Sequence, residues 1–189
     1  MSHIKTLAIV TLAASAIAVP TLALAEGGGG GGGVTYGTPN SGNVNITGSV
    51  ALKCDITNDP VTLALGELAG AGGTLDTSKV NGHSVNLTGW CNGTKSTMSV
   101  QATSIALTPA LPTNQVPSGF DQSVDYTATA TANSVSATDS SSTPGAGSAV
   151  TVGAFTGNIG VSLSSASASG LLVAGSYQGT TTVTLTPGM

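Results

Sequence analysis

Apolar and polar residues alternate along much of the chain from residue 43 onward. In the segment NVNITGSVALKC (43–54), Val44, Ile46, Val50 and Leu52 take alternate positions, with polar or small residues between them. Successive side chains of a β-strand point to opposite faces, so this period predicts a strand with one apolar face. The segment follows seven consecutive glycines and ends on one of two cysteines.

The same alternation predicts further strands. The runs are 61–68, 84–91, 97–103, 123–133, 149–164 and the C-terminal segment 174–189. The run 149–164 is interpreted as two strands, or as one interrupted by a bulge at its glycines. A tight turn between 84–91 and 97–103 predicts a hairpin. Seven or eight short strands without a helical period predict an all-β fold, an antiparallel sandwich with an immunoglobulin-like arrangement.

The first 25 residues have the pattern of a secretory signal peptide. A short positive start (MSHIK) precedes an apolar run and a small-residue cleavage site, Ala23-Leu24-Ala25. The alternative is a membrane anchor, but the apolar run of about 14 residues is shorter than the roughly 20 that span a bilayer. We therefore expect export without stable membrane insertion. The expected organisation is a signal peptide (1–25), a flexible glycine-rich extension (26–42) and one β-sandwich domain (43–189).

Charged residues are sparse, which limits the possible partners. Four Lys and Arg stand against eight Asp and Glu, and there is no arginine. Nucleic-acid binding depends on clustered cations that replace phosphate counterions, so this class is excluded. The many Ser, Gly and Thr residues also suit disorder, but the alternation and a mean hydropathy of +0.31 oppose it for most of the chain. Local disorder is expected in the glycine tract and in ATDSSSTPGAGSA (137–149).

The two cysteines, Cys54 and Cys91, are expected to form a disulfide in an exported protein. Closing a loop of about 37 residues is worth on the order of 4 kcal/mol in the chain-entropy description. The alternative is two free thiols.

Candidate catalytic and metal-binding residues are few. His83, the one histidine after the expected signal peptide, lies in the turn NGHS, and no G-x-S-x-G motif presents a serine to it. Asp121 and Asp125 share a strand face at roughly 13 Å, too far apart for glycoside hydrolysis. Asp55 and Asp59 offer oxygen ligands for calcium, although capping of a turn is the favoured interpretation. We expect no enzymatic activity, no cofactor and no metal.

Four segments together resemble the spore coat protein U domain family, on the pilin side of the chaperone–usher proteins. They are the opening strand from Val44 to Val50 followed by Cys54, LALGEL (63–68), SVNLTGWCNGTKSTMSVQA (84–102) and AGSYQGTTTVTLTP (174–187). The chain departs from the family pattern at Leu65, where an aromatic residue is usual, and in its C-terminal TPGM.

The resemblance implies a mechanism of assembly. A pilin-type sandwich lacks its last strand, and a periplasmic chaperone covers the open groove until the N-terminal extension of the next subunit fills it at an outer-membrane usher. The implied donor residues are Val34, Tyr36, Val44 and Ile46, with Gly48 as a bend before the subunit's own first strand, 50–54. The alternative is that 43–54 is the first strand of a complete sandwich.

Two functions follow as hypotheses. The first is an exported structural subunit of a surface fibre (pilus) or coat. It passes through the periplasm and then polymerises with identical or related subunits at the cell surface. The second is a self-contained secreted sandwich that binds a carbohydrate or another ligand through long loops, since connections often carry function.

Overall fold

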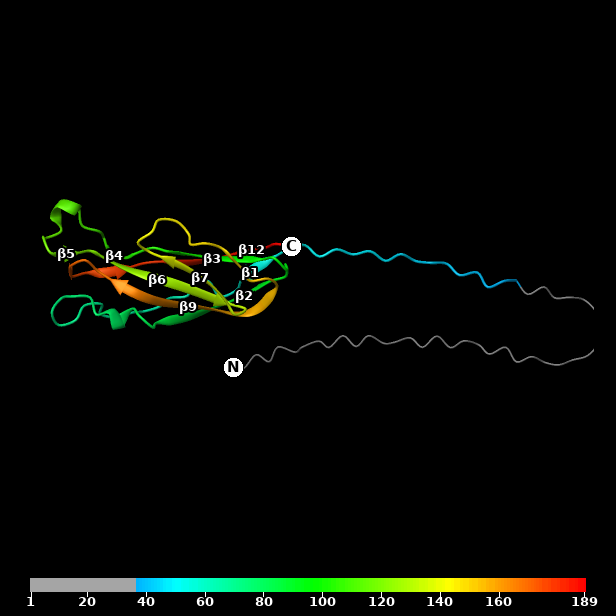
Figure 1. The fold of residues 1–189 in the computed structure, drawn as a ribbon, viewed down its shortest axis with the longest axis horizontal. Helices are drawn as coiled ribbons and strands as arrows, with labels where there is room; N and C mark the ends of the chain where they lie inside the picture. Colours follow the sequence, from blue (N-terminus) through cyan, green and yellow to red (C-terminus); the bar gives the residue numbers. More distant parts are fainter. Residues whose placement is uncertain (1–36) are drawn as a thin grey trace, which may run out of the picture. The chain divides into compact units, whose positions relative to one another are not determined.

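The computed structural model describes residues 37–189, of which residues 47–189 form the β-domain (Figure 1). The expected signal peptide (1–25) and most of the expected glycine-rich extension lie outside the described residues. Two of the four donor candidates, Val34 and Tyr36, also lie outside them. These expectations therefore stay predictions.

Twelve β-strands and two short 3₁₀ helices, without an α-helix, make up the described β-domain. The predicted all-β class is confirmed, and the strands pair antiparallel except for the short β5–β10 pair. The 3₁₀ helices are η1 (Thr77–Lys79) and η2 (Thr113–Gln115). The strands are β1 (Cys54–Ile56), β2 (Ser84–Cys91), β3 (Thr97–Ala102), β4 (Ile105–Thr108), β5 (Phe120–Asp121), β6 (Ser123–Ala132), β7 (Val135–Ser140), β8 (Val150–Thr151), β9 (Phe155–Ser167), β10 (Leu171–Leu172), β11 (Ser176–Gln178) and β12 (Thr181–Thr186).

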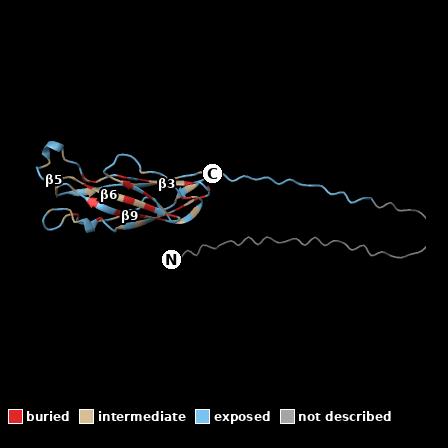
Figure 2. Cartoon of the chain, in the orientation of Figure 1, coloured by how far each residue is buried: buried red, intermediate tan, exposed pale blue. Residues whose placement is uncertain are grey.

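Two sheets pack face to face around one core, and β5 and β10 form a separate two-stranded sheet. The larger sheet has the strand order β1-β2-β9-β6-β4-β11, with β7 also paired to β6, and the smaller has the order β12-β3-β8. Met98 and Val100 of β3 and Ile159 of β9 belong to one buried cluster. Figure 2 shows buried and more exposed residues alternating along β6 and β9. On β6 the buried positions include three alanines, Ala128, Ala130 and Ala132, and threonines stand between them.

One ribbon of paired strands crosses from the smaller sheet to the larger. After Ala102 the chain runs from β3 into β4, and after Gln178 it runs from β11 into β12. β12 pairs with β3, and β11 pairs with β4. At the crossing, a Cβ on Gly179 would lie 3.0 Å from Cα of Ile105, so a larger residue does not fit there without a shift of the backbone.

The structure confirms several predicted strands. The runs 84–91, 97–103 and 123–133 correspond to β2, β3 and β6, and the interrupted run 149–164 corresponds to β8 and β9. The predicted disulfide is also present, and Cys54 lies opposite Cys91 in the β1–β2 register.

Four sequence-based expectations are corrected. The predicted strand 43–54 is wrong except for its last residue, because the first strand is Cys54–Ile56. Residues 61–68, which are predicted to form a strand, are described by the structure but form none. The predicted hairpin is wrong, since β2 and β3 belong to different sheets. The segment 137–149, expected to be disordered, contains the end of β7.

Candidate functional site

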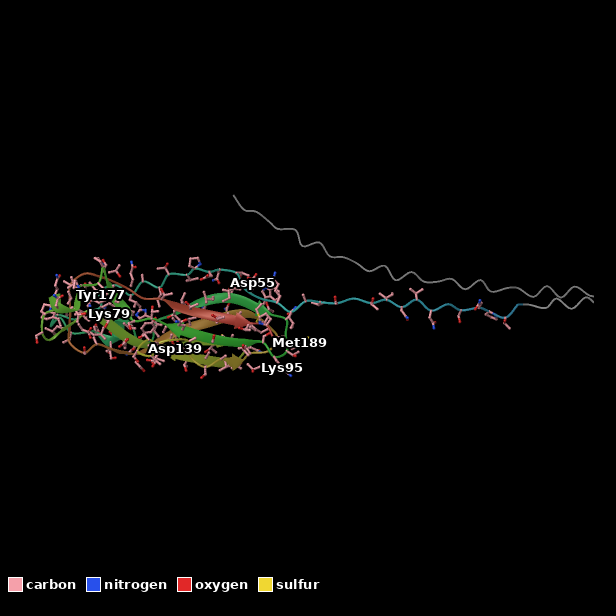
Figure 3. All side chains as sticks on the ribbon, turned by 90° about the horizontal axis from the view of Figure 1, so that it is seen from above. Asp55, Lys79, Lys95, Asp139, Tyr177 and Met189 are labelled. Carbon is pink, nitrogen blue, oxygen red and sulfur yellow. A yellow bond between two sulfur atoms is a disulfide. The ribbon has the colours of Figure 1, made fainter. Side chains whose placement is uncertain are left out.

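A groove of about 1280 Å³ lies in the β-domain between the edge of the smaller sheet and the inner face of the larger one. Val85 and Leu87 of β2 and Val161 and Leu163 of β9 line it from the larger sheet. The rest of its lining includes residues 176–183 of β11 and β12 and the segment 59–69. Figure 3 places Tyr177, which lines the groove, toward the opposite end of the domain from Asp55.

The groove has a mixed polar and apolar lining, and its apolar side chains are incompletely covered. Leu63, Leu65, Val85, Leu87 and Val183 pack against the core and remain only partly buried. By contrast, the residues of β3 that face the same core are fully buried. Complete burial of an exposed side chain of this kind is worth about 1.5–3 kcal/mol, and covering these partly buried ones contributes a fraction of that. The groove therefore carries apolar surface that an added strand would cover.

The outer edge of β12 is unpaired along this groove. β12 pairs with β3 over six residue pairs, from Thr181–Ala102 to Thr186–Thr97. No strand among the described residues pairs with its other edge, because β12 is the terminal strand of its sheet. An unpaired edge presents backbone N–H and C=O groups that can pair with another extended segment.

The corresponding edge of β2 is protected by Asn58. After β1 ends at Ile56, the Asn58 side chain accepts a hydrogen bond from the Thr88 N–H (2.6 Å) and donates one to the Asn86 carbonyl (3.2 Å). The Thr57 N–H also donates to the Thr88 carbonyl at 2.8 Å. Asn58 thus extends the pairing of β1 along β2, and the edge of β12 is the better place for an added strand.

The segment predicted as a strand at 61–68 lines the groove without pairing to a strand. It starts after Pro60, which has no backbone N–H, and Gly66 turns the chain with a φ of +74°. Leu63 and Leu65 are half-buried and Leu68 is buried. The alternation that predicted a strand therefore describes how these side chains face the groove.

A hydrogen bond between two polar side chains of the lining links the two sheets. The Tyr126 hydroxyl lies 2.8 Å from Oγ1 of Thr181 and connects β6 to β12. Burial raises the pKa of Tyr126, the hydrogen bond with Thr181 lowers it, and the negative charge of Asp139 raises it, with a net increase. The phenol is thus held neutral in the folded protein.

Asp121 holds together the end of the domain near Tyr177. Its carboxylate accepts hydrogen bonds from the backbone and hydroxyl groups of Ser123 and of Ser169. Burial raises the pKa of Asp121, but these hydrogen bonds outweigh burial and lower it to about 2. The Tyr177 hydroxyl donates to the Val173 carbonyl at 2.8 Å, and burial and the charge of Asp121 raise its pKa. These contacts order the loops beside the groove.

The other predicted candidates for chemistry do not converge. Asp125 accepts hydrogen bonds from the hydroxyls of Ser104 (2.6 Å) and Ser141 (2.9 Å), away from Asp121 and its serines. His83 lies at the start of β2, where its carbonyl accepts from the Leu163 N–H at 3.0 Å. Among residues 37–189, no three His, Cys, Asp or Glu residues gather as a metal site. In this part of the chain, no helix is long and apolar enough to span a bilayer.

The two described donor candidates, Val44 and Ile46, are 86% and 93% exposed. Val50, which the resemblance places in the subunit's own first strand, is 87% exposed, and Leu52 is also exposed. The alternating pattern of 43–54 includes Val50 and Leu52. The pattern alone does not indicate that the first strand of the domain begins only at Cys54.

No family model, curated protein or solved structure was found to match this chain.

Proposed function

We propose that this protein is an exported structural subunit that assembles into a surface fibre or coat by donating an N-terminal strand to the groove of another copy. The observation that carries the proposal is the groove with partly uncovered apolar side chains beside the unpaired edge of β12. The same chain holds an alternating apolar segment whose residues Val44, Ile46 and Val50 are almost fully exposed.

The segment and the groove are complementary in length and chemistry. Seven extended residues, 44–50, span about 20 Å at roughly 3.3 Å per residue, and residues 176–183, which line the groove from β11 to β12, span a similar length. Val44, Ile46 and Val50 share one face, so all three can enter the groove while the backbone pairs along the edge formed by β11 and the start of β12. Adding a strand in this way is a known mode of peptide recognition, in which main-chain hydrogen bonds give affinity and side-chain pockets give specificity.

Such a contact joins two different surfaces, so it does not close on itself. A donor segment on one copy and a groove on the next form a heterologous interface, which generates an open fibre. Before assembly, the groove and the free edge of β12 favour aggregation. We therefore include a periplasmic chaperone and an outer-membrane usher as partners, with export through the periplasm to the cell surface.

Charge substitutions in the donor segment test the proposal. Ile46→Asp places a carboxylate in the groove, and the share of protein in denaturant-resistant multimers should fall at least about tenfold, since burying an unpaired charge is costly. Asn45→Asp is the matched control, because it adds the same charge to the face that points away. Multimers should be separated by size and compared for the full chain purified after export.

Two outcomes would contradict the proposal. Multimers that persist in Ile46→Asp would show that this face of the segment does not enter a groove. A wild-type protein that stays monomeric, and that refolds reversibly after deletion of residues 26–48, would instead favour the self-contained ligand-binding sandwich.

A further inference from the structure

Asn92 binds the residues that immediately precede β1. Its backbone N–H donates to the Lys53 carbonyl at 3.1 Å. Its Oδ1 accepts from the Lys53 N–H at 2.7 Å, and its Nδ2 donates to the Ala51 carbonyl at 2.8 Å. The side chain thus replaces the backbone that a longer β2 would offer, because the chain leaves β2 after Cys91.

Further contacts hold residues 52–54 at the same place. A Cβ on Gly93 would lie 2.9 Å from Cδ2 of Leu52, so Leu52 packs directly on this glycine. Nζ of Lys53 lies 6.0 Å from the centroid of the Trp90 ring, within the range of a cation–π contact. Cys54 is joined to Cys91. Together these contacts attach the chain to the end of β2.

The attachment stops at Ala51. Residues 47–50 make no hydrogen bond with the rest of the described β-domain, and Val50 is 87% exposed. Residues 51–54 do not line the groove, whose lining begins on this side with Ile56 and ends along β12 at Val183. The chain therefore reaches the domain at a fixed point just outside the groove.

We propose that Asn92 is a positioning residue that makes the exchange of strands intermolecular. This inference rests on the function proposed above. From Cys54 to Asp59 the chain runs toward the groove. For its own residues 44–50 to lie beside β12, the chain must reverse direction between Val50 and Cys54, and such a reversal needs residues 51–53 as a turn. Asn92 holds these residues extended, whereas the segment of a second copy needs no reversal.

Asn58 provides a matched control. Like Asn92, it accepts one backbone hydrogen bond and donates another through its side chain, to Thr88 and Asn86. It lies after β1 and does not touch residues 51–53. Replacing either asparagine by alanine removes the same number of side-chain hydrogen bonds. Only Asn92→Ala, however, frees residues 51–53 to form the turn that a within-copy contact requires.

The experiment follows where the donor segment binds. A photo-crosslinking amino acid replaces Ile46 in the full chain purified after export, and two isotopically distinct preparations are mixed during assembly. Mass spectrometry of the crosslinked peptides then distinguishes links within one copy from links between copies. The wild type should link position 46 to groove residues of another copy. In Asn92→Ala the ratio of within-copy to between-copy links should increase about fivefold or more, because two hydrogen bonds that oppose the turn are lost.

The remaining variants separate the possible failures. Asn58→Ala should keep the wild-type ratio. Asn92→Asp keeps the acceptor for the Lys53 N–H and loses the donor to Ala51, so it should give an intermediate ratio if Asn92→Ala does not fold. A wild-type ratio in Asn92→Asp, or in folded Asn92→Ala, overturns the role of Asn92 and leaves the proposed function standing. A wild type without links to the groove overturns the proposed function itself.

Discussion

The hydroxyl groups of Tyr126 and Thr181 lie 2.8 Å apart and connect the two sheets of the sandwich at the groove. β6 holds Tyr126 from the larger sheet, and β12, which holds Thr181, is secured on one edge only. The contact therefore helps to keep the unpaired strand in place.

Removing this contact should lower stability by a modest amount. For Tyr126→Phe we expect the free energy of unfolding in urea to fall by about 1 kcal/mol, the usual net value of one hydrogen bond. Thr181→Val removes the other partner. In the double variant the two losses should not add, because both remove the same bond. Additive losses would mean that the two hydroxyls act separately.

Alkaline pH should destabilise the fold through the phenols of Tyr126, which is buried, and Tyr177, which is half-buried. The pKa values of Tyr126 and Tyr177 are raised above 10.0, first by burial. A raised pKa favours the neutral form in the folded state, so the stabilisation is complete below pH 10 and is lost as the pH rises through the higher folded values. The urea midpoint should fall above pH 10. It should fall less steeply in Tyr126→Phe.

Acid should weaken the end of the domain that Asp121 holds together. The pKa of Asp121 is lowered from 3.8 to about 2, so its contribution is present above pH 3.8 and is lost as the pH falls toward about 2. Asp121→Asn should flatten the decline of the urea midpoint over this range. Asp55→Asn is the control, because no hydrogen bond to the Asp55 carboxylate occurs in the described residues, and it should keep the wild-type decline.

Loss of the disulfide should be costly. Cys54 and Cys91 are 37 residues apart, and opening a loop of this length costs about 4 kcal/mol in the chain-entropy description. Urea unfolding of the paired Cys54→Ser, Cys91→Ser variant measures this loss. A change below about 1 kcal/mol would show that the unfolded chain is already restricted in this region.

Gly93 should tolerate no side chain. A Cβ at this position would collide with the Gly188 carbonyl and lie 2.8 Å from Oγ of Ser96. We expect Gly93→Ala to lower the free energy of unfolding by about 1–3 kcal/mol, as is usual for overpacking. Gly72→Ala is the control, since nothing lies within 4 Å of its added Cβ, and thermal unfolding should place it near the wild type.

The sequence predicted strands best where a strand has neighbours on both sides. β2 and β6 lie inside the larger sheet, so one face is buried and the alternation is regular. The segments 43–53 and 61–68 alternate as regularly, but they pair with no strand in the described part of the chain. Alternation indicates an apolar face and does not identify its partner.

The polar composition of β7 is the reason that the sequence does not predict this strand. Its sequence VSATDS has few apolar residues, but Ala137 is small enough to fill its place in the core. Asp139 is buried because its carboxylate accepts the Ala102 N–H at 2.8 Å. This hydrogen bond joins residues 37 positions apart, and no local pattern reveals it.

The groove was beyond prediction for a related reason. Its location depends on which strand lies at the edge of each sheet. The alternation in the sequence predicts strands, but it does not predict the order in which they pair. The predicted hairpin of β2 and β3 failed in the same way, because the short turn after Cys91 leads into the other sheet. The cysteine pairing could be predicted because two cysteines allow only one intramolecular bond.

The pairing of β12 with β3 has a kinetic consequence. Thr181 lies opposite Ala102, about eighty positions earlier in the chain, so the smaller sheet forms only after a long loop has closed. Until then, Met98 and Val100 lack β12, which pairs with both of them in the native sheet. Refolding should accordingly be slow, on a timescale of milliseconds to seconds, as for other β-rich domains with distant partners.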